Sequence, residues 1–468
     1  MKKLLTFLII IAVTVVAVML YNPNLFDDGK NTPPEKSTPG LVYTLNDSGY
    51  YEVSVGTAVN ESEIIIPSAH KGVEVRYVAE EGFKGCTALV TLTISGSSIN
   101  VNYGAFENCT SLTTVNASAF PWLSANAFKG CTSLKSISLS ATESIGEHAF
   151  DGCVSLEDVG ALNQVKTIHE YAFFGCENLK SIDLGTRMTT VWSYAFFGCK
   201  SLSEITFPDT NHLIGEYAFS ECTGLKTVSF GSALVDINEG AFSGCTGITA
   251  VSIPDSVTLI RKNAFMGCSS IKTLEIGRGV ESIYNGAFSD CTVLESIYYN
   301  AECAEDAGAN NNIFLNAGSA SDGIELIIGK AVSTIPTHMF SPTSKKEGSP
   351  KITSLNFERD AVCTTIGDEA FAYIDSLEEA AIAHSVRRIN RDAFSYCSSL
   401  KTIYIPAGIE SIDSSTFTDC TALTSVLFGG TDEEWKAAYA DQFEIASENP
   451  IKNANVYFNR TIDFSYSK

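Results

Sequence analysis

The sequence lacks the short motifs that mark the common catalytic centres. It has no HExxH zinc signature, no GxSxG nucleophile elbow and no glycine-rich phosphate-binding loop. Its six histidines form no close pair, and its acidic residues form no recurring pair of the kind that a glycosidase needs. We therefore predict no catalytic residues, no metal site and no bound cofactor.

Positive charge is also scarce. The 468 residues include 31 lysines and arginines against 54 aspartates and glutamates, which gives a formal net charge of -23 and an isoelectric point near 4.6. A surface this acidic repels phosphate backbones and anionic lipid headgroups. We therefore predict no nucleic-acid partner, and we expect contact with a membrane through the N-terminal segment only.

Charged residues are absent from one stretch near the N-terminus. The run from Leu4 to Leu20 is uncharged, and a helix of that length at ~1.5 Å per residue approaches the ~30 Å thickness of a bilayer core. Lys2 and Lys3 precede it and should stay cytoplasmic, which directs the rest of the chain outward. We expect residues 1–20 to form a signal anchor, with a cleaved signal peptide as the alternative. Residues 21–40, rich in Pro, Asn, Asp and Lys, then form an extended linker.

One pattern recurs along most of the chain. A phenylalanine returns every 22 or 23 residues from position 83 to position 288 and again from 371 to 417, and a cysteine follows three residues later in twelve of thirteen copies. The phrase "LKSISL" then alternates polar and apolar residues, which is typical of a strand with one buried face. The other half, as in "IGEHAF", favours a turn of irregular helix behind that strand. Because one unit cannot bury its apolar face alone, we predict a stacked solenoid with one parallel strand per coil.

The pattern A-F-x-x-C-x-x-L-x-x-[IV]-x-[IL], over roughly residues 75–430, resembles the leucine-rich repeats of the BspA type, which are also found in a treponemal surface protein. The resemblance implies a leucine-rich repeat solenoid of the α/β type, a right-handed coil with one short parallel strand per ~23-residue repeat. It also implies a convex side that is mostly irregular or formed by short helices. The resemblance is specific for the fold and much less specific for function.

Departures from the repeat divide the rest of the chain. We predict Thr431 as the N-cap of a C-terminal helix, and we expect Trp435 and Tyr439 to cover the last coil. The insertions after residue 298 represent either drift of the repeat or loops that carry binding specificity. The expected segments are an N-terminal β-cap over 41–78, regular repeats over 79–298, degenerate repeats with insertions over 299–365, regular repeats over 366–430, and a C-terminal helix and strand cap over 431–468.

The fourteen cysteines call for an explanation in an exported protein. Twelve recur at one position of the repeat beside Phe and Leu, so we expect a ladder of buried free thiols that act as small apolar side chains. Disulfides between neighbouring coils and metal ligation are the alternatives. Cys303 and Cys363 lie outside this frame and are the candidates for a specific pair.

The outward positions of the predicted strands form the candidate ligand face. They are rich in Ser and Thr, which either suit weak binding at many points along an extended ligand or merely favour strands and solubility. The residues chosen are Ser136, Ser181, Asp183, Glu204, Thr206, Thr273, Glu275, Tyr298, Thr402 and Tyr404.

These features predict a non-catalytic recognition protein, monomeric, and either displayed on the outer face of the cell membrane or secreted. Through the resemblance, the expected activity is adhesion in a bacterium, with an extracellular protein or glycan as the ligand. The alternatives are a structural or scaffold protein of the cell envelope and an enzyme that acts on surface polymers. A contiguous patch of exposed aromatic residues on the strand face or in the insertions would favour adhesion.

Overall fold

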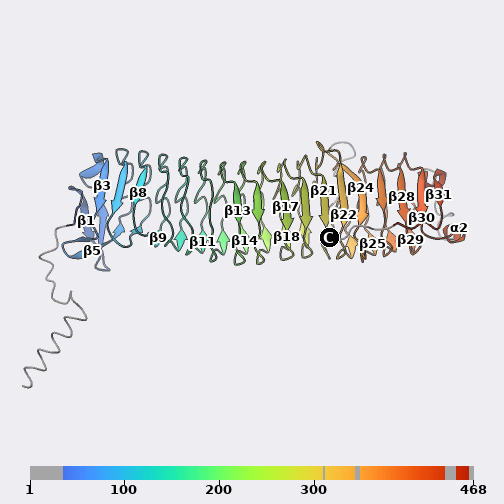
Figure 1. Ribbon diagram of the computed structural model, residues 1–468, viewed down its shortest axis with the longest axis horizontal. Coiled ribbons are helices and arrows are strands. Elements are labelled where there is room, and N and C mark those ends of the chain that lie inside the picture. The colour runs from blue at the N-terminus through green and yellow to red at the C-terminus, as the bar shows by residue number, and fades with distance from the viewer. Residues whose placement is uncertain (1–34, 309–310, 343–347, 438–448, 463–468) are drawn as a thin grey trace, which may run out of the picture.

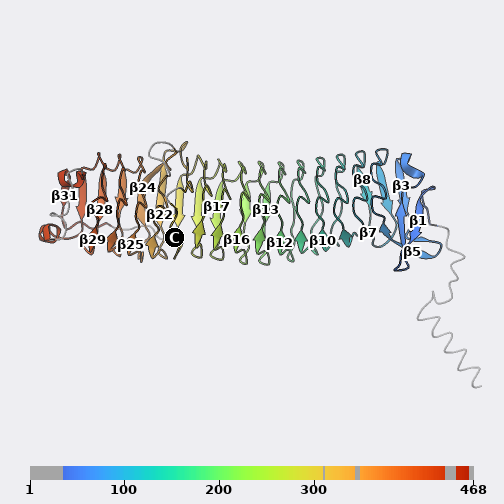
Figure 2. The same cartoon turned by 180° about the vertical axis from the view of Figure 1, so that it is seen from behind.

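The computed structural model describes residues 35–308, 311–342, 348–437 and 449–462, and in this part of the chain the polypeptide winds into one long β-solenoid. The coils follow one another from the N-terminal to the C-terminal end of the rod (Figures 1 and 2). The predicted solenoid is confirmed. Residues 1–20, which carry the expected signal anchor, and most of the expected linker lie outside the described residues.

One row of parallel strands is the predicted one, formed by the alternating residues that follow each cysteine. Backbone hydrogen bonding divides this row into sheets of three, two and nine strands. Its strands are β3 (Glu63–Ile66), β6 (Thr91–Ile94), β8 (Thr114–Asn116), β13 (Glu204–Thr206), β15 (Thr227–Ser229), β17 (Ala250–Ile253), β19 (Thr273–Ile276), β21 (Ser296–Tyr299), β22 (Ile324–Ile328), β24 (Ile352–Phe357), β26 (Glu379–Ala381), β28 (Thr402–Ile405), β30 (Ser425–Phe428) and β31 (Asn455–Tyr457).

A second row of shorter parallel strands was not predicted. It starts at β2 (Tyr51–Ser54), which pairs in parallel with β5 (Val73–Val78), and its later members are two residues long. These are β7 (Asn100–Val101), β9 (Trp122–Leu123), β10 (Ser144–Ile145), β11 (Thr167–Ile168), β12 (Thr190–Val191), β14 (Leu213–Ile214), β16 (Asp236–Ile237), β18 (Leu259–Ile260), β20 (Ser282–Ile283), β23 (Thr334–Ile335), β25 (Thr365–Ile366), β27 (Arg388–Ile389) and β29 (Ser411–Ile412).

Turns, and not helix, connect each short strand to the next long strand. Among the described residues between 61 and 431, the chain forms no helix, so the irregular convex side is confirmed without its helical component. The reason lies in the backbone: most coils hold one residue with positive φ shortly before the ladder phenylalanine and one shortly after it, as Tyr171 (φ 56°) and Gly175 (φ 67°) do around Phe173. A left-handed residue cannot continue a right-handed helix.

The core is a stack of equivalent side chains. Fifteen phenylalanines, from Phe83 to Phe417, form one ladder in which neighbouring ring centroids lie 5.0–5.9 Å apart. Phe314 and Phe340 belong to it, so the coils expected to be degenerate keep their place in the stack. The insertions therefore lengthen the loops and leave the core continuous.

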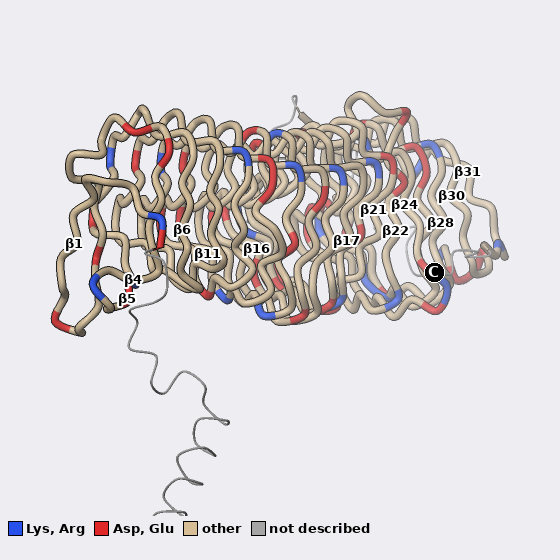
Figure 3. Tube along the Cα trace, turned by 60° about the vertical axis from the view of Figure 1, so that its left-hand side comes forward, with Lys and Arg blue, Asp and Glu red and all other residues tan. Residues whose placement is uncertain are grey.

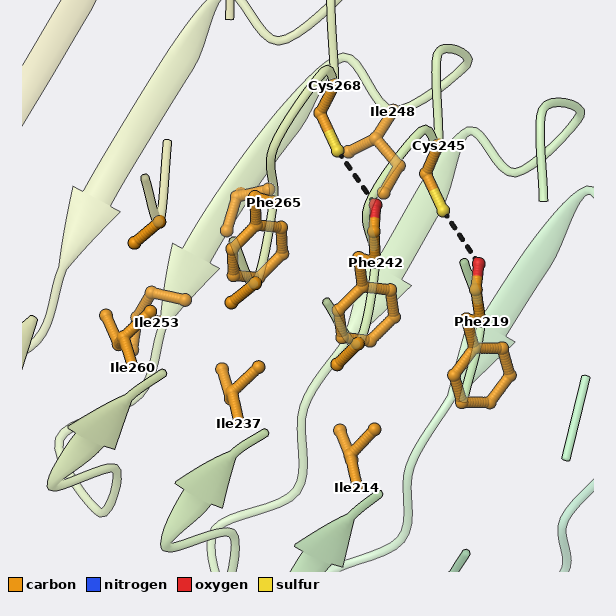
Figure 4. Packing of buried hydrophobic residues seen from close by; sticks show 14 of the residues in the cluster. Ile214, Phe219, Ile237, Phe242, Cys245, Ile248, Ile253, Ile260, Phe265 and Cys268 are labelled. Carbon is orange, nitrogen blue, oxygen red and sulfur yellow. Dashed lines mark hydrogen bonds between the residues drawn. The ribbon is translucent and has the colours of Figure 1, made fainter. Parts of the chain in front are cut away.

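The thiols sit beside this ladder. All fourteen cysteines are free. Eleven of those in the repeat frame donate Sγ–H to the carbonyl of the preceding coil's ladder phenylalanine, at 3.0–3.6 Å, as Cys245 does to Phe219 and Cys268 to Phe242 (Figure 4). The expected ladder of buried free thiols is confirmed. Each of these eleven thiols is a second donor to a carbonyl that already accepts a backbone N–H of its own coil, as the Phe219 carbonyl does from Cys222 at 3.3 Å and the Phe242 carbonyl from Cys245 at 3.2 Å.

The two ends of the rod depart from the repeat. At the N-terminal end, β1 (Val42–Leu45) pairs antiparallel with β2 (Tyr51–Ser54), and β4 (Ala69–His70) pairs antiparallel with β5. A 3-10 turn, η1 (Ala58–Asn60), follows β2 in the sequence and precedes β3. That these segments act as caps, and the domain boundaries themselves, stay predictions.

At the C-terminal end, α2 (Asp432–Trp435) begins at Thr431, whose side chain accepts a hydrogen bond from the backbone N–H of Glu434. The predicted N-cap is confirmed. Trp435 is buried with its ring 5.2 Å from that of Phe428, while Tyr439 lies outside the described residues. A second 3-10 turn, η3 (Pro450–Asn453), leads into β31.

Candidate functional site

The strand face is the solvent side of the long-strand row. On β13, Glu204 and Thr206 are exposed on either side of buried Ile205, as predicted. Strand pairing places Thr206 opposite Ser229 and Glu275 opposite Tyr298 on the neighbouring coils. The outward side chains therefore run in straight rows across adjacent coils, on a backbone that the buried ladder holds in place.

Three of the predicted residues lie outside regular strands. Ser136 forms isolated bridges with Thr114 and Asp158, Asp183 forms one with Ala161, and Ser181 belongs to no strand, although Ser136, Ser181 and Asp183 are all exposed.

The neighbouring turns give a physical reason. The carboxylates of Asp158 and Asp183 accept hydrogen bonds from the backbone N–H of Gly160 and Gly185, at 3.0 and 2.9 Å. Such local turns compete with the ladder for the same backbone groups. The expectation of a strand at Ser136, Ser181 and Asp183 was wrong.

The two tyrosines chosen for the face are not free contact residues. Tyr404 is only 1% exposed: its hydroxyl lies 3.3 Å from His384 Nδ1 and its ring packs edge-on against that imidazole. The choice of Tyr404 was wrong because the neighbouring turn covers an outward strand position. Tyr298 is partly exposed, as Thr402 is, and its hydroxyl donates to Glu358 Oε2 at 2.7 Å. The Tyr298 pKa is raised, mainly by burial and secondly by this hydrogen bond.

A groove of about 300 Å³ opens on the strand face between β15 and β17. These two strands belong to different sheets, so the groove lies where the long-strand ladder is interrupted. Ser252 donates its hydroxyl to Glu275 Oε2 at 3.1 Å inside it. The lining residues are Lys226, Thr227, Val228, Ser229, Thr249, Ala250, Val251, Ser252, Thr273 and Glu275. Hydroxyls, a carboxylate and an ammonium group over an apolar floor can hydrogen-bond to a polar chain.

A second cavity, of about 360 Å³, lies at the start of the segment with insertions. Tyr284, Asn285 and Asp306 line it, together with Glu305, which accepts a hydrogen bond from the Ser282 hydroxyl at 2.8 Å. The carboxylate of Asp306 accepts the backbone N–H of Thr337 at 2.7 Å, so it helps to hold two coils together. The polar groups of this cavity therefore already serve the connection between coils.

The chemistry-bearing side chains are dispersed along the rod. Within the described ranges, no group of three or more His, Cys, Asp or Glu is arranged to hold a metal ion. Cys363 is buried and donates to the Thr365 carbonyl at 3.5 Å, whereas Cys303 is exposed, so this candidate pair does not form a disulfide. Burial raises the pKa of Cys363 to about 11, which keeps its thiol protonated.

The strand face carries no contiguous aromatic patch among the described residues, but another surface does. Tyr171, Tyr194 and Tyr217 follow each other at 23-residue intervals in "EYAF", "SYAF" and "EYAF", and they stack in the turns after the short strands. These tyrosines were not predicted as contact residues, because the candidate face was drawn from outward strand positions only. The signal was available in the spacing of the tyrosines.

Comparisons with known proteins agree with this architecture. The family profile described as "BspA type Leucine rich repeat region (6 copies)" matches residues 60–180, 143–245, 214–347 and 334–438. No curated protein matches the sequence at a significant level.

Solved structures of bacterial repeat proteins are similar to this chain. A leucine-rich repeat protein from Bacteroides ovatus is 21% identical, with 92% of this chain and 99% of that chain covered and a TM-score of 0.44. A leucine-rich cell surface protein from Faecalibacterium prausnitzii is 21% identical, covering 87% and 98%, with a TM-score of 0.31. A leucine-rich repeat protein of T. pallidum is 22% identical, covering 50% and 91%, with a TM-score of 0.29.

Proposed function

Because the chain belongs to the BspA-type leucine-rich repeat family, we propose that it is a non-catalytic recognition protein that binds an extracellular protein through its strand face. The observation that carries this proposal is the groove between β15 and β17. A rigid, repetitive scaffold presents rows of polar side chains there, and the interruption of the ladder provides a recess that a partner can enter.

The proposed location is outside the cell, either on the outer face of the cell membrane or in the medium. The support is the uncharged run from Leu4 to Leu20 behind Lys2 and Lys3. Across the described part of the chain, no helix has both the length and the apolar character that a membrane crossing requires. Adhesion to another cell or to a host surface is the activity that fits this location.

The test is binding of the whole chain, solubilised in mild detergent, to a panel of immobilised extracellular-matrix and cell-surface proteins. The groove variant Thr227→Arg/Ser252→Arg places two large cationic side chains in the recess. The matched control is Thr223→Arg/Thr246→Arg, which alters exposed threonines of the same two coils outside the groove. We expect saturable binding that the groove variant loses and the control keeps.

Two results would count against the proposal. Binding that survives in the groove variant would place the contact surface elsewhere on the rod. Absence of binding to every panel member would favour the alternative of a scaffold protein of the envelope.

A further inference from the structure

Four stacked rings run along the turns of four successive coils. His148, Tyr171, Tyr194 and Tyr217 each stand two residues before a ladder phenylalanine, and their ring centroids lie 4.7, 4.9 and 5.1 Å apart. All four are partly exposed. We call this set the aromatic row. It lies on the turns, away from the strand face.

The backbone at these positions is unfavourable for an aromatic residue. The four residues have φ between 52° and 57°, a region that glycine and asparagine enter most readily. The chain itself uses those residue types at the equivalent position of five other coils: Gly104, Asn126, Gly240, Asn263 and Gly286. Four further coils place Glu81, His338, Glu369 and Asp392 there, so what sets the row apart is the run of three tyrosines in adjacent coils. Strained backbone under such a run is typical of functional surfaces.

A second aromatic pair widens the surface. Phe174 and Phe197 stack on each other at 5.0 Å, and they lie 5.7 and 5.9 Å from Tyr171 and Tyr194. Trp192, 37% exposed, belongs to the same coil as Tyr194. Because the stacked rings cover one another's faces, they present mainly their edges to solvent, and the Tyr217 hydroxyl donates to Glu239 Oε1 at 3.1 Å. Such a surface offers little open ring face for a sugar to stack on, and tyrosine and tryptophan are enriched where proteins contact each other.

Carboxylates accompany the row. Glu147, Glu170 and Glu216 each directly precede one of the four ring residues, and Glu239 holds the same position in the next coil. The side chain of Glu147 is 57% exposed. Among the described residues of this region, the ion pairs stand at its two ends. At one end, His148 lies 3.6 Å from Glu147 and 2.9 Å from Asp151, which also pairs with Lys129 at 2.9 Å. At the other end, Lys262 pairs with Glu239 at 3.6 Å, and Glu170 and Glu216 stand between these ends. The centre of the surface is therefore acidic, within a rod that carries acidic residues along its length (Figure 3).

We propose that the aromatic row and its flanking glutamates bind an extended, basic segment of a partner protein. Arginine or lysine side chains would lie between the carboxylates and the tyrosine hydroxyls, where charge and hydrogen bonding act together. From Glu147 to Glu239 the surface crosses four coil steps of ~4.8 Å, which matches about six residues of extended chain. A second copy of this chain is a poor partner, since its own net charge of -23 repels. This inference does not depend on binding at the strand face.

The test uses the full chain in mild detergent and a labelled peptide of alternating arginine and serine, with a glutamate–serine peptide as the charge-reversed probe, in a fluorescence anisotropy titration. The key variant is Tyr171→Asn/Tyr194→Asn/Tyr217→Asn, because Asn126 and Asn263 show that asparagine fits this backbone. We expect saturable binding of the basic peptide only, weakened about tenfold or more in the triple variant. The matched control, Tyr103→Asn/Tyr284→Asn, removes exposed tyrosines outside the row and should bind as the unaltered chain does.

A second pair of variants separates a specific site from general attraction to an acidic rod. Glu147→Gln/Glu170→Gln/Glu216→Gln should weaken binding, whereas Glu177→Gln/Glu295→Gln/Glu378→Gln, which removes the same charge elsewhere, should not. Equal weakening in both would overturn the proposal, and so would unaltered affinity in the tyrosine variant or no saturable binding at low salt. The groove variant of the strand face should leave this binding unchanged, so the two proposals fail independently.

Discussion

Phe173 and Phe174 are neighbours in sequence but occupy opposite environments. The ring of Phe173 is fully buried in the ladder, 5.2 Å from Phe150 and 5.1 Å from Phe196. The ring of Phe174 is partly exposed and stacks on a single phenylalanine, Phe197. The repeat pattern alone distinguishes them, because only Phe173 stands at the recurring position.

This pair gives a prediction at the residue scale. Phe173→Ala leaves a cavity between two rings and should lower the free energy of unfolding by about 3–5 kcal/mol. Phe174→Ala should cost about 1 kcal/mol, since it loses the stacking on Phe197 and a tilted contact with Tyr171, both at the surface. Urea unfolding followed by circular dichroism measures both, as shifts of the midpoint relative to the unaltered chain. Equal shifts would contradict the assignment of the core to the ladder.

At the scale of the structural element, the sequence predicts long strands better than short ones. The residues of β17 or β19 alternate over a whole strand, so their period is visible. A two-residue strand such as β11 is too short to show any period. It forms because the equivalent residues of the two adjacent coils, in β10 and β12, pair with it. The exposure of Tyr404 was predicted wrongly for a similar reason, because the residue that covers it is His384, twenty residues away in sequence. Local patterns do not contain such contacts.

The turns give a prediction at this scale. Gly175 has φ 67° with no neighbouring atom within 4 Å of an added Cβ, so a side chain there meets backbone strain and no steric clash. Gly175→Ala should destabilise the protein by about 1–2 kcal/mol. Gly175→Asn should cost only a few tenths of that, because Asn108 and Asn316 adopt positive φ at the equivalent position. Thermal unfolding of the two variants tests this, and an equal loss in both would contradict it.

At the scale of the whole molecule, the stack tolerates insertions because each coil contacts only its neighbours. Phe340 and Phe371 are 31 residues apart, yet their rings stack at 5.4 Å with parallel planes. The sequence predicted regular repeats on both sides of this region and degenerate repeats with insertions over 299–365. The sequence did not reveal that β21 pairs with β22 and β22 with β24, so that the sheet continues without a gap across the segment with insertions.

The buried thiols of the ladder should make the stability of the whole rod fall at alkaline pH. Burial raises the pKa of Cys268 and of Cys420 to about 12, from an ordinary value of 9.0. The folded chain therefore keeps these protons while the unfolded chain loses them, so their contribution to stability is complete below pH 9 and falls as the pH rises toward 12. Each such thiol should lower the free energy of unfolding by about 1.4 kcal/mol per pH unit in this window.

Urea midpoints measured at about pH 8 and about pH 10 test this dependence. We expect a marked fall for the unaltered chain, and a shallower one for Cys268→Ala, which removes one buried thiol at some cost in stability at neutral pH. Cys303→Ala is the control, since its thiol is exposed and its loss should leave the slope unchanged. A midpoint that is the same at the two pH values would contradict this account. It would mean that the buried thiols ionise as easily as exposed ones. Such thiols could not be held in the folded core as proton donors to the phenylalanine carbonyls.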